Sequence, residues 1–300
     1  MSSAEAGAAS LPARRRGSFA TFTRRNPTIV IGSAMLIAML LVAVFAPWIS
    51  GDPFNVNPSI RLRGPDLAGF FVAGNTQRFG TDNLGRDVFA RTVWGARVSL
   101  LVGMSVAVFA TTTGLVIGLL AGYFRTLDAI VMRVMDALMA IPGILLAIAL
   151  VALTRGGVPV VIFAITVPEV PRVVRLVRAV VLTVRERPFI DAAVSVGSRA
   201  RKVIFRHILP NTVAPLIVQA TYICASAILT EAGLSFLGAG VPPEIPTWGN
   251  MIAQARLFLA RAPWTIFFPG ICLALVVLAI NLLGDGLRDR LDPRLARRMR

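Results

Sequence analysis

DAAVSVGSRARKVIFRHILPN, residues 191–211, is the stretch that decides how the rest of the chain is interpreted. It is polar and basic, yet it lies between long apolar blocks in a chain that is 56% hydrophobic and only 15% charged. The mean hydropathy of +0.73 exceeds what the core of a soluble protein of 300 residues requires. The composition therefore predicts an integral membrane protein, in which residues 191–211 form a charged insert on one side of the membrane.

Apolar blocks divide the chain into stretches that are each close to the ~20 residues a helix needs to cross the hydrocarbon. The fourth block is the least apolar because it contains Glu169 and three prolines. Without it, the basic segment 172–206 would lie on the opposite side from both basic termini, so we retain it. The sequence predicts an all-α integral membrane protein with six transmembrane helices. The expected spans are residues 29–49, 98–122, 129–153, 157–177, 212–237 and 264–286.

Basic residues predict the orientation, because loops rich in lysine and arginine stay in the cytoplasm. With the N-terminus inside, 22 of the 31 basic residues fall in cytoplasmic segments. All four tryptophans fall at expected outer ends or in outer loops, where indole rings favour the interface. We expect a multi-pass protein of the plasma membrane with both termini cytoplasmic. Its expected parts are a flexible cytosolic tail (1–26), a first helix with an extracytoplasmic loop (27–97), a five-helix core that includes the insert (98–287) and a basic cytosolic tail (288–300).

Other classes of protein are disfavoured by the same residues. The net charge of +16 does not indicate a nucleic-acid partner, because the arginines cluster between apolar blocks and at the ends. Cys224 and Cys272 lie in apolar segments without CxxC or histidine spacing, so we expect free thiols and no metal site. The first apolar run is longer than the core of a signal peptide, so we expect it to be retained; cleavage is the minority alternative.

Glycines and a proline predict local structure at two places. Gly114, Gly118 and Gly122 lie four residues apart, which lets a neighbouring helix approach closely; we favour packing over a gating hinge. In the insert, Pro188 suits the first turn of a helix and Gly197 suits a left-handed cap at its end. A second short helix over 199–209 would follow, capped by Ser198.

The first short helix is expected to carry a small apolar face made of Phe189, Ile190, Ala193 and Val194. Such a face fits a groove on a partner protein. An amphipathic connector that rests on anionic lipid headgroups is the alternative. The pattern alone does not separate the two.

Several stretches outside the insert carry a family resemblance. They are FGTDNLGRDVFARTVWGARVSLLVG (79–103), MRVMDALMAIP (132–142), RLVRAVVLTVRERPF (175–189) and LTEAGLSFLGAGVPPEIPTWGNM (229–251). With Asp191-Ala192-Ala193, Gly197 and Leu209-Pro210 of the insert, they resemble the permease subunits of dipeptide and oligopeptide ATP-binding-cassette (ABC) importers. The resemblance is to the subunit with a long outer loop after its first span, and it covers about residues 27–290. Asp191 replaces the usual glutamate, and Val170 stands where an aromatic residue is expected.

This resemblance implies the type I ABC importer transmembrane fold, with the loop 186–210 as a cytoplasmic coupling helix. The implied partners are a second homologous permease subunit, two ABC ATPase subunits that bind ATP and Mg²⁺, and an extracytoplasmic peptide-binding protein. The chain itself would hold no cofactor, and it lacks the G-x-x-x-x-G-K-[ST] phosphate loop of an ATPase. The residues implied in coupling are Phe189, Ile190, Asp191, Ala192, Ala193, Val194, Gly197, Arg206, His207, Leu209 and Pro210.

Charged residues elsewhere each have two interpretations. The outer loop carries Asp82, Arg86, Asp87 and Arg91. They either receive the binding protein or, as we favour, form a salt-bridged cap that orients the second span. Glu169 and Glu231 are costly in lipid, so they either line the pathway or bond to a neighbouring helix. Asp136 lies one turn from Arg133 and is expected to pair with it.

Import of a di- or oligopeptide is the function that the resemblance implies. A nickel chelate, haem or a sugar remain open as cargo, because related systems place most selectivity in the binding protein. A proton-coupled secondary carrier is the alternative from another class, with Glu231 or Glu169 as its relay, but it leaves the insert without a role. A purely structural membrane subunit would tolerate the loss of Gly197.

Overall fold

The computed structural model describes residues 26–66, 78–154 and 156–291. The expected N-terminal tail lies outside the described residues except for residue 26, and most of the expected C-terminal tail does too. Within the described ranges the regular structure is helical, and an isolated β-bridge joins Thr81 and Asp87. The predicted all-α fold class is confirmed.

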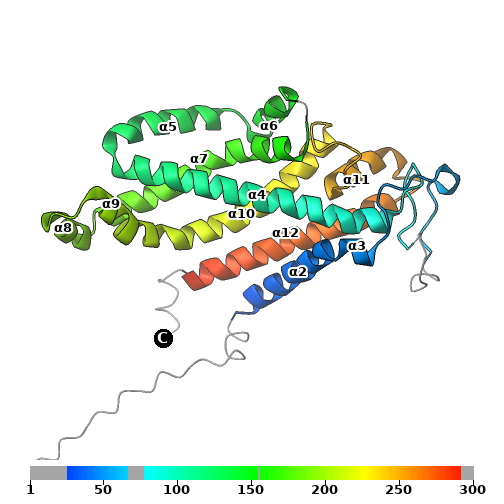
Figure 1. The fold of residues 1–300 in the computed structure, drawn as a ribbon, viewed down its shortest axis with the longest axis horizontal. Helices are drawn as coiled ribbons and strands as arrows, with labels where there is room; N and C mark the ends of the chain where they lie inside the picture. Colours follow the sequence, from blue (N-terminus) through cyan, green and yellow to red (C-terminus); the bar gives the residue numbers. More distant parts are fainter. Residues whose placement is uncertain (1–25, 67–77, 155, 292–300) are drawn as a thin grey trace, which may run out of the picture.

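Long helices run back and forth along one axis of the molecule (Figure 1). They are α2 (Pro27–Val44), α4 (Val88–Tyr123), α5 (Arg125–Ala140) with α6 (Gly143–Ala152), α7 (Val158–Arg185), α10 (Leu209–Phe236) and α12 (Trp264–Leu291). The short elements are α3 (Ala46–Ile49), η1 (Pro58–Ile60), α8 (Pro188–Ser195), α9 (Ala200–Val203), η2 (Ile204–Ile208), α11 (Trp248–Ala255) and η3 (Arg256–Phe258). In Figure 1, α8 lies at one end of the bundle and α3 and α11 at the other. The start of α2 and the end of α12 point towards the α8 end.

In the described part of the chain, four helical stretches are long and apolar enough to cross a membrane: α2, α4, the stretch 200–236 and α12. The bent pair α5 and α6 passes the same test together, so the number is five when the pair is counted as one broken span. The third expected span is therefore not one straight helix, because the chain turns by 87° between α5 and α6. Pro142 explains the break: it disfavours helical backbone at Ile141, which has φ −92° and ψ 128°.

The helix α7 is 28 residues long, but it does not meet the same criterion of apolar composition. Three arginines and Glu169 interrupt its apolar face between positions 169 and 178. It lies in the core of the bundle, packed along α4. The fourth expected span is thus a helix, longer than expected, whose polar face requires protein or water beside it.

Contact between α4 and α7 depends on the glycine face of α4. A Cβ atom on Gly114 would lie 2.5 Å from Cβ of Val173, and one on Gly118 would lie 2.8 Å from Cβ of Val177. Gly122 repeats the pattern one turn further on. No side chain larger than hydrogen fits at these positions, so the predicted packing role of the glycines is confirmed. The same contacts set the register of the two helices: each residue of α4 lies level with the residue of α7 that is 59 positions later in the chain.

Candidate functional site

The insert folds as a short helix and a sharp turn. Helix α8 begins at Pro188, as expected. Gly197 has a φ of +82°, and its N–H donates to the carbonyl of Val194 at 2.8 Å. The N–H of Ser198 reaches the carbonyl of Ala193 at 3.1 Å. These bonds satisfy carbonyls at the end of α8 and require the left-handed conformation that glycine tolerates.

The second short helix of the insert is not separate, which corrects the expectation. Helix α9 and the π-helical turn η2 continue into α10, and no side-chain hydrogen bond from Ser198 caps α9. Pro210 has no N–H to donate to the carbonyl of Arg206, and its ring would clash there in a regular helix. The wider turn avoids this conflict, because the N–H of Leu209 bonds to the carbonyl of Ile204 instead.

The apolar face of the insert differs from the expected one. Phe189 and Val194 are 48% and 52% exposed, but Ile190 is only 2% exposed and packs into the core of the bundle. Successive helical positions point about 100° apart, and in α8 this places Ile190 against the bundle while Phe189 faces outwards. Val196 and Phe205, which the sequence analysis did not select, are 87% and 59% exposed.

The remaining expected coupling residues lie around this face. Asp191, Ala192, Arg206 and Pro210 are exposed, whereas Ala193, His207 and Leu209 are partly buried. The ring centroid of His207 in η2 is 6.3 Å from that of Phe189 in α8, so these two elements lie close together. An open hollow beside them is lined by Arg199, Arg201, Lys202, Phe205 and Arg206.

The charged residues of the outer loop gather at the α11 end of the bundle. Nε of Arg86 lies 2.6 Å from Oδ2 of Asp82, and Nη2 of Arg86 donates to Gln254 of α11 at 2.6 Å. Asp87 caps α4, because its Oδ1 accepts from the N–H of Phe89 at 2.8 Å. Burial raises the pKa of the Asp87 carboxyl to about 6.

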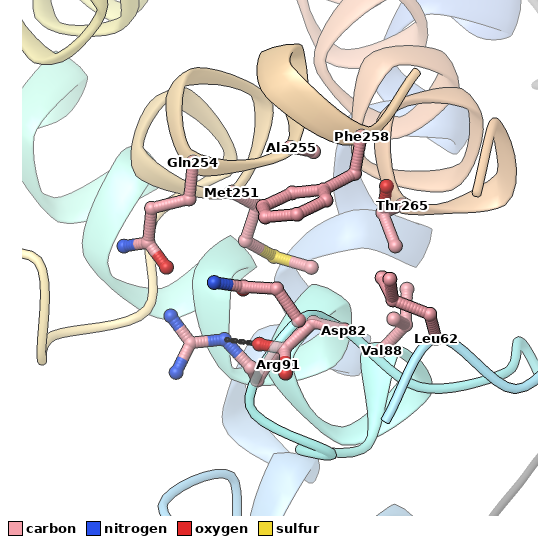
Figure 2. Close-up of a pocket in the computed structure, with 10 residues that line it drawn as sticks. Leu62, Asp82, Val88, Arg91, Met251, Gln254, Ala255, Phe258 and Thr265 are labelled. Carbon is pink, nitrogen blue, oxygen red and sulfur yellow. Dashed lines mark ion pairs between the residues drawn. The ribbon is translucent and has the colours of Figure 1, made fainter. Parts of the chain in front are cut away.

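Arg91 points inwards beneath this cluster, where Figure 2 shows it directed at Asp82. It is 1% exposed, and its Nε lies 3.9 Å from Oδ2 of Asp82. The cavity beside them, lined also by Met251 and Phe258, is about 10 Å³, enough for a single water molecule. A partner protein could not reach Arg91 in this arrangement, which is that of an internal cap.

Glu231 is fully buried between α10 and α11. Its Oε1 accepts hydrogen bonds from Ser235 at 2.8 Å and from Thr247 at 2.9 Å. The Thr247 hydroxyl in turn caps α11 by accepting from the N–H of Asn250 at 3.0 Å. The geometry therefore places Glu231 in a bond between neighbouring helices rather than on a surface of this chain.

Trp248 is a residue whose place the sequence analysis predicted wrongly. It was expected at the membrane interface, but it is fully buried. Its indole N–H donates to the carbonyl of Thr92 at 3.0 Å, and its ring lies against Gly95, where a Cβ would be 3.2 Å from Cδ1.

Ion pairs join α7 to α5 along the polar face of α7. Arg175 pairs with Asp136 at 2.6 Å, and Arg178 pairs with Asp128. The expected pair between Asp136 and Arg133 is therefore wrong, because Asp136 pairs with Arg175 on the neighbouring helix. Glu169, which is 6% exposed, bonds to Arg172 on its own helix at 2.9 Å.

Family models match two parts of the chain. Residues 114–297 match the model described as binding-protein-dependent transport system inner membrane component. Residues 22–65 match the model of the N-terminal TM domain of oligopeptide transport permease C.

Curated relatives extend the likeness over most of the chain. A probable peptide ABC transporter permease protein, y4tQ of Sinorhizobium fredii, is 56% identical over 92% of this chain and 92% of its own. The dipeptide transport system permease protein DppC of Alkalihalophilus pseudofirmus is 43% identical over 91% of this chain and 88% of its own.

Among solved structures, an inward-facing form of the MetNI methionine ABC transporter is similar in fold. The TM-score is 0.54 with 21% identity, over 67% of this chain and 96% of that one. A second inward-facing crystal form gives a TM-score of 0.55. This likeness concerns the fold alone.

Proposed function

The chain belongs to the family of binding-protein-dependent transport system inner membrane components, and we propose that it is the permease subunit of an ATP-driven importer of di- or oligopeptides. It would form half of the passage through the membrane. The fold is that of a type I ABC importer transmembrane domain. The observation that carries the proposal is the likeness to peptide permeases over about nine-tenths of both chains.

Coupling to the ATPase is proposed for α8. Its exposed Phe189 and Val194 supply an apolar surface that a cleft on an ABC ATPase subunit can cover. Two such subunits, which bind ATP and Mg²⁺, would supply the energy. This chain's own contribution is mechanical: the Gly197 turn joins α8 to the continuous stretch 200–236, so a movement of α8 reaches α10 without passing through a flexible loop.

The bundle also suggests how the chain sits in the membrane. We place the α8 end in the cytoplasm, because that end carries the basic insert. The start of α2 and the end of α12 both point to that end, which would make both tails cytoplasmic (Figure 1). The α11 end would then face the extracytoplasmic peptide-binding protein, and a second, homologous permease subunit would complete the passage.

A proton-coupled carrier is less well supported. Glu231 would have to exchange protons with water, but it is fully buried and held by two hydroxyl groups. Such a carrier also gives no role to the exposed apolar face of α8. Peptide remains the cargo that the relatives favour over a nickel chelate, haem or a sugar.

Replacing an exposed residue of α8 tests this proposal directly. The permease pair, the ATPase subunits and the binding protein are reconstituted in liposomes, and uptake of dialanine is followed with and without ATP. Phe189→Asp should abolish co-purification of the ATPase and lower uptake at least tenfold, whereas the conservative Phe189→Leu should keep both. Uptake that needs no ATP, or that survives Phe189→Asp, would overturn the assignment.

A further inference from the structure

The polar face of α7 lies at membrane depth, where charged side chains are unexpected. Because Gly114 and Gly118 contact Val173 and Val177, Arg175 is level with Val116 of α4. Val116 lies six residues before the end of the apolar block 98–122, so Arg175 is about 9 Å inside that boundary. Arg172 is deeper by a further ~4.5 Å.

These charges are paired, yet they are not enclosed by this chain. The side chains of Arg172 and Arg175 are 56% and 44% exposed, and that of Asp136 is 58% exposed. Glu169 is different, because it is buried behind Arg172 and holds that guanidinium in place. The side chains of Arg172, Arg175 and Asp136 therefore point away from the bundle, at a depth where contact of a charge with lipid is costly.

We infer that this face of α5 and α7 lines the water-filled passage, and that Arg175 and Asp136 form a transient binding site for the charged ends of a zwitterionic peptide. The inference rests on the proposed function, and it names the surface and the side chains that the cargo meets. Neither residue was expected on the pathway from the sequence, which pointed to Glu169 and Glu231 instead.

The chemistry of the pair fits such a ligand. An arginine binds a carboxylate through two parallel N–H donors, and an aspartate accepts from an ammonium group. A peptide that inserts between Arg175 and Asp136 gives each of them a new partner, so neither charge is left without one. The pair then re-forms behind the peptide. Both residues are about half exposed, so the exchange takes place in water and the binding stays weak enough for release.

The rival explanation is structural: the pair only ties α5 to α7, and the partner permease covers it. Thiol accessibility in the complete transporter separates the two. Arg175→Cys is made with Cys224 and Cys272 replaced by alanine, and the complex is treated with a membrane-impermeant methanethiosulfonate, which reacts with a thiolate in water. Val116→Cys is the control at the same depth, 57% exposed on the apolar surface of α4.

The expected result is modification of Arg175→Cys in the resting or the vanadate-trapped state, with no modification of Val116→Cys in either. If the cysteine at position 175 stays unmodified in both states, the face is covered and the inference fails. This measurement does not depend on the cargo, so it distinguishes failure of the inference from failure of the proposed function.

Uptake of dialanine tests the role in binding. The double variant Arg175→Gln with Asp136→Asn keeps a hydrogen bond between the two helices but removes both charges. A structural tie predicts uptake within twofold of wild type, whereas a charged binding site predicts a fall of at least tenfold with unchanged thermal stability of the complex. Uptake within twofold would overturn the inference, provided that the wild type transports dialanine under the same conditions.

Discussion

Alanine at Gly114 is expected to destabilise the bundle, although alanine favours a helix. Its Cβ would lie 2.5 Å from Cβ of Val173, whereas carbon atoms in contact are separated by about 3.5–4.0 Å. Both atoms are attached directly to a backbone, so the helices must move apart by about 1 Å over a tightly packed face. Overpacking of this kind destabilises a protein by about 1–3 kcal/mol, and we expect a value at the upper end of that range here. The higher helix propensity of alanine offsets about 1 kcal/mol of this loss. The net loss should be about 2 kcal/mol.

The assay is thermal unfolding of the purified complex in detergent, where this loss corresponds to a decrease of about 4–8 °C in Tm. Gly270→Ala in α12 is the matched control, because a Cβ there meets nothing within 4 Å. Adding Val173→Ala to Gly114→Ala should not restore the Tm, since alanine keeps the clashing Cβ; Val173→Gly should restore part of it. If Gly114→Ala and Gly270→Ala unfold at the same temperature, the close-packing argument is refuted.

Further predictions concern Gly197, Glu231 and Asp87. Gly197→Val should lower peptide uptake per ATP hydrolysed at least tenfold, because valine is strained at a φ of +82°. Gly156→Val is the control, since Gly156 has a φ of +76° and equally open space around it. If Gly197→Val leaves the uptake per ATP unchanged, the coupling role is rejected. Glu231→Leu should destabilise the complex by about 1–3 kcal/mol in thermal unfolding, because two buried hydroxyls lose their acceptor, while Glu231→Gln should cost less; equal stability of the two variants would contradict this. Burial raises the pKa of Asp87 from 3.8 to about 6, so its contribution to stability is present below pH ~4 and is lost as the pH rises through about 6. Asp87→Asn should remove that part of the pH dependence of Tm, and a profile that is unchanged by the substitution would disprove it.

Features that depend on local chain chemistry could be predicted from the sequence. The start of α8 at Pro188 and the left-handed turn at Gly197 follow from the backbone preferences of single residues. The packing of α4 follows from the spacing of its glycines alone. The bend after α5 was within reach too, because Pro142 disfavours helical backbone before it, but the apolar run across it suggested an unbroken span.

Features that depend on which helix lies beside which could not be predicted. Asp136 has a cation one turn away on its own helix, and only the packing of α5 against α7 shows that Arg175 is its partner. Trp248 lies at a position in the sequence where a tryptophan at the membrane interface is expected. Its burial becomes apparent only when α11 folds back onto α4. The orientation of Ile190 likewise depends on where the bundle lies relative to α8.

The π-helical turn η2 determines the direction in which the insert points. Each residue of an α-helix adds a rotation of about 100°, so the one additional residue in a π turn rotates everything before it by about that angle relative to α10. A chain that gained or lost one residue between Ile204 and Ile208 would turn Phe189 and Val194 towards another side while its spans stayed in place. Importers of this kind could thus be matched to differently placed ATPase clefts by single-residue insertions or deletions, with no change in the transmembrane bundle.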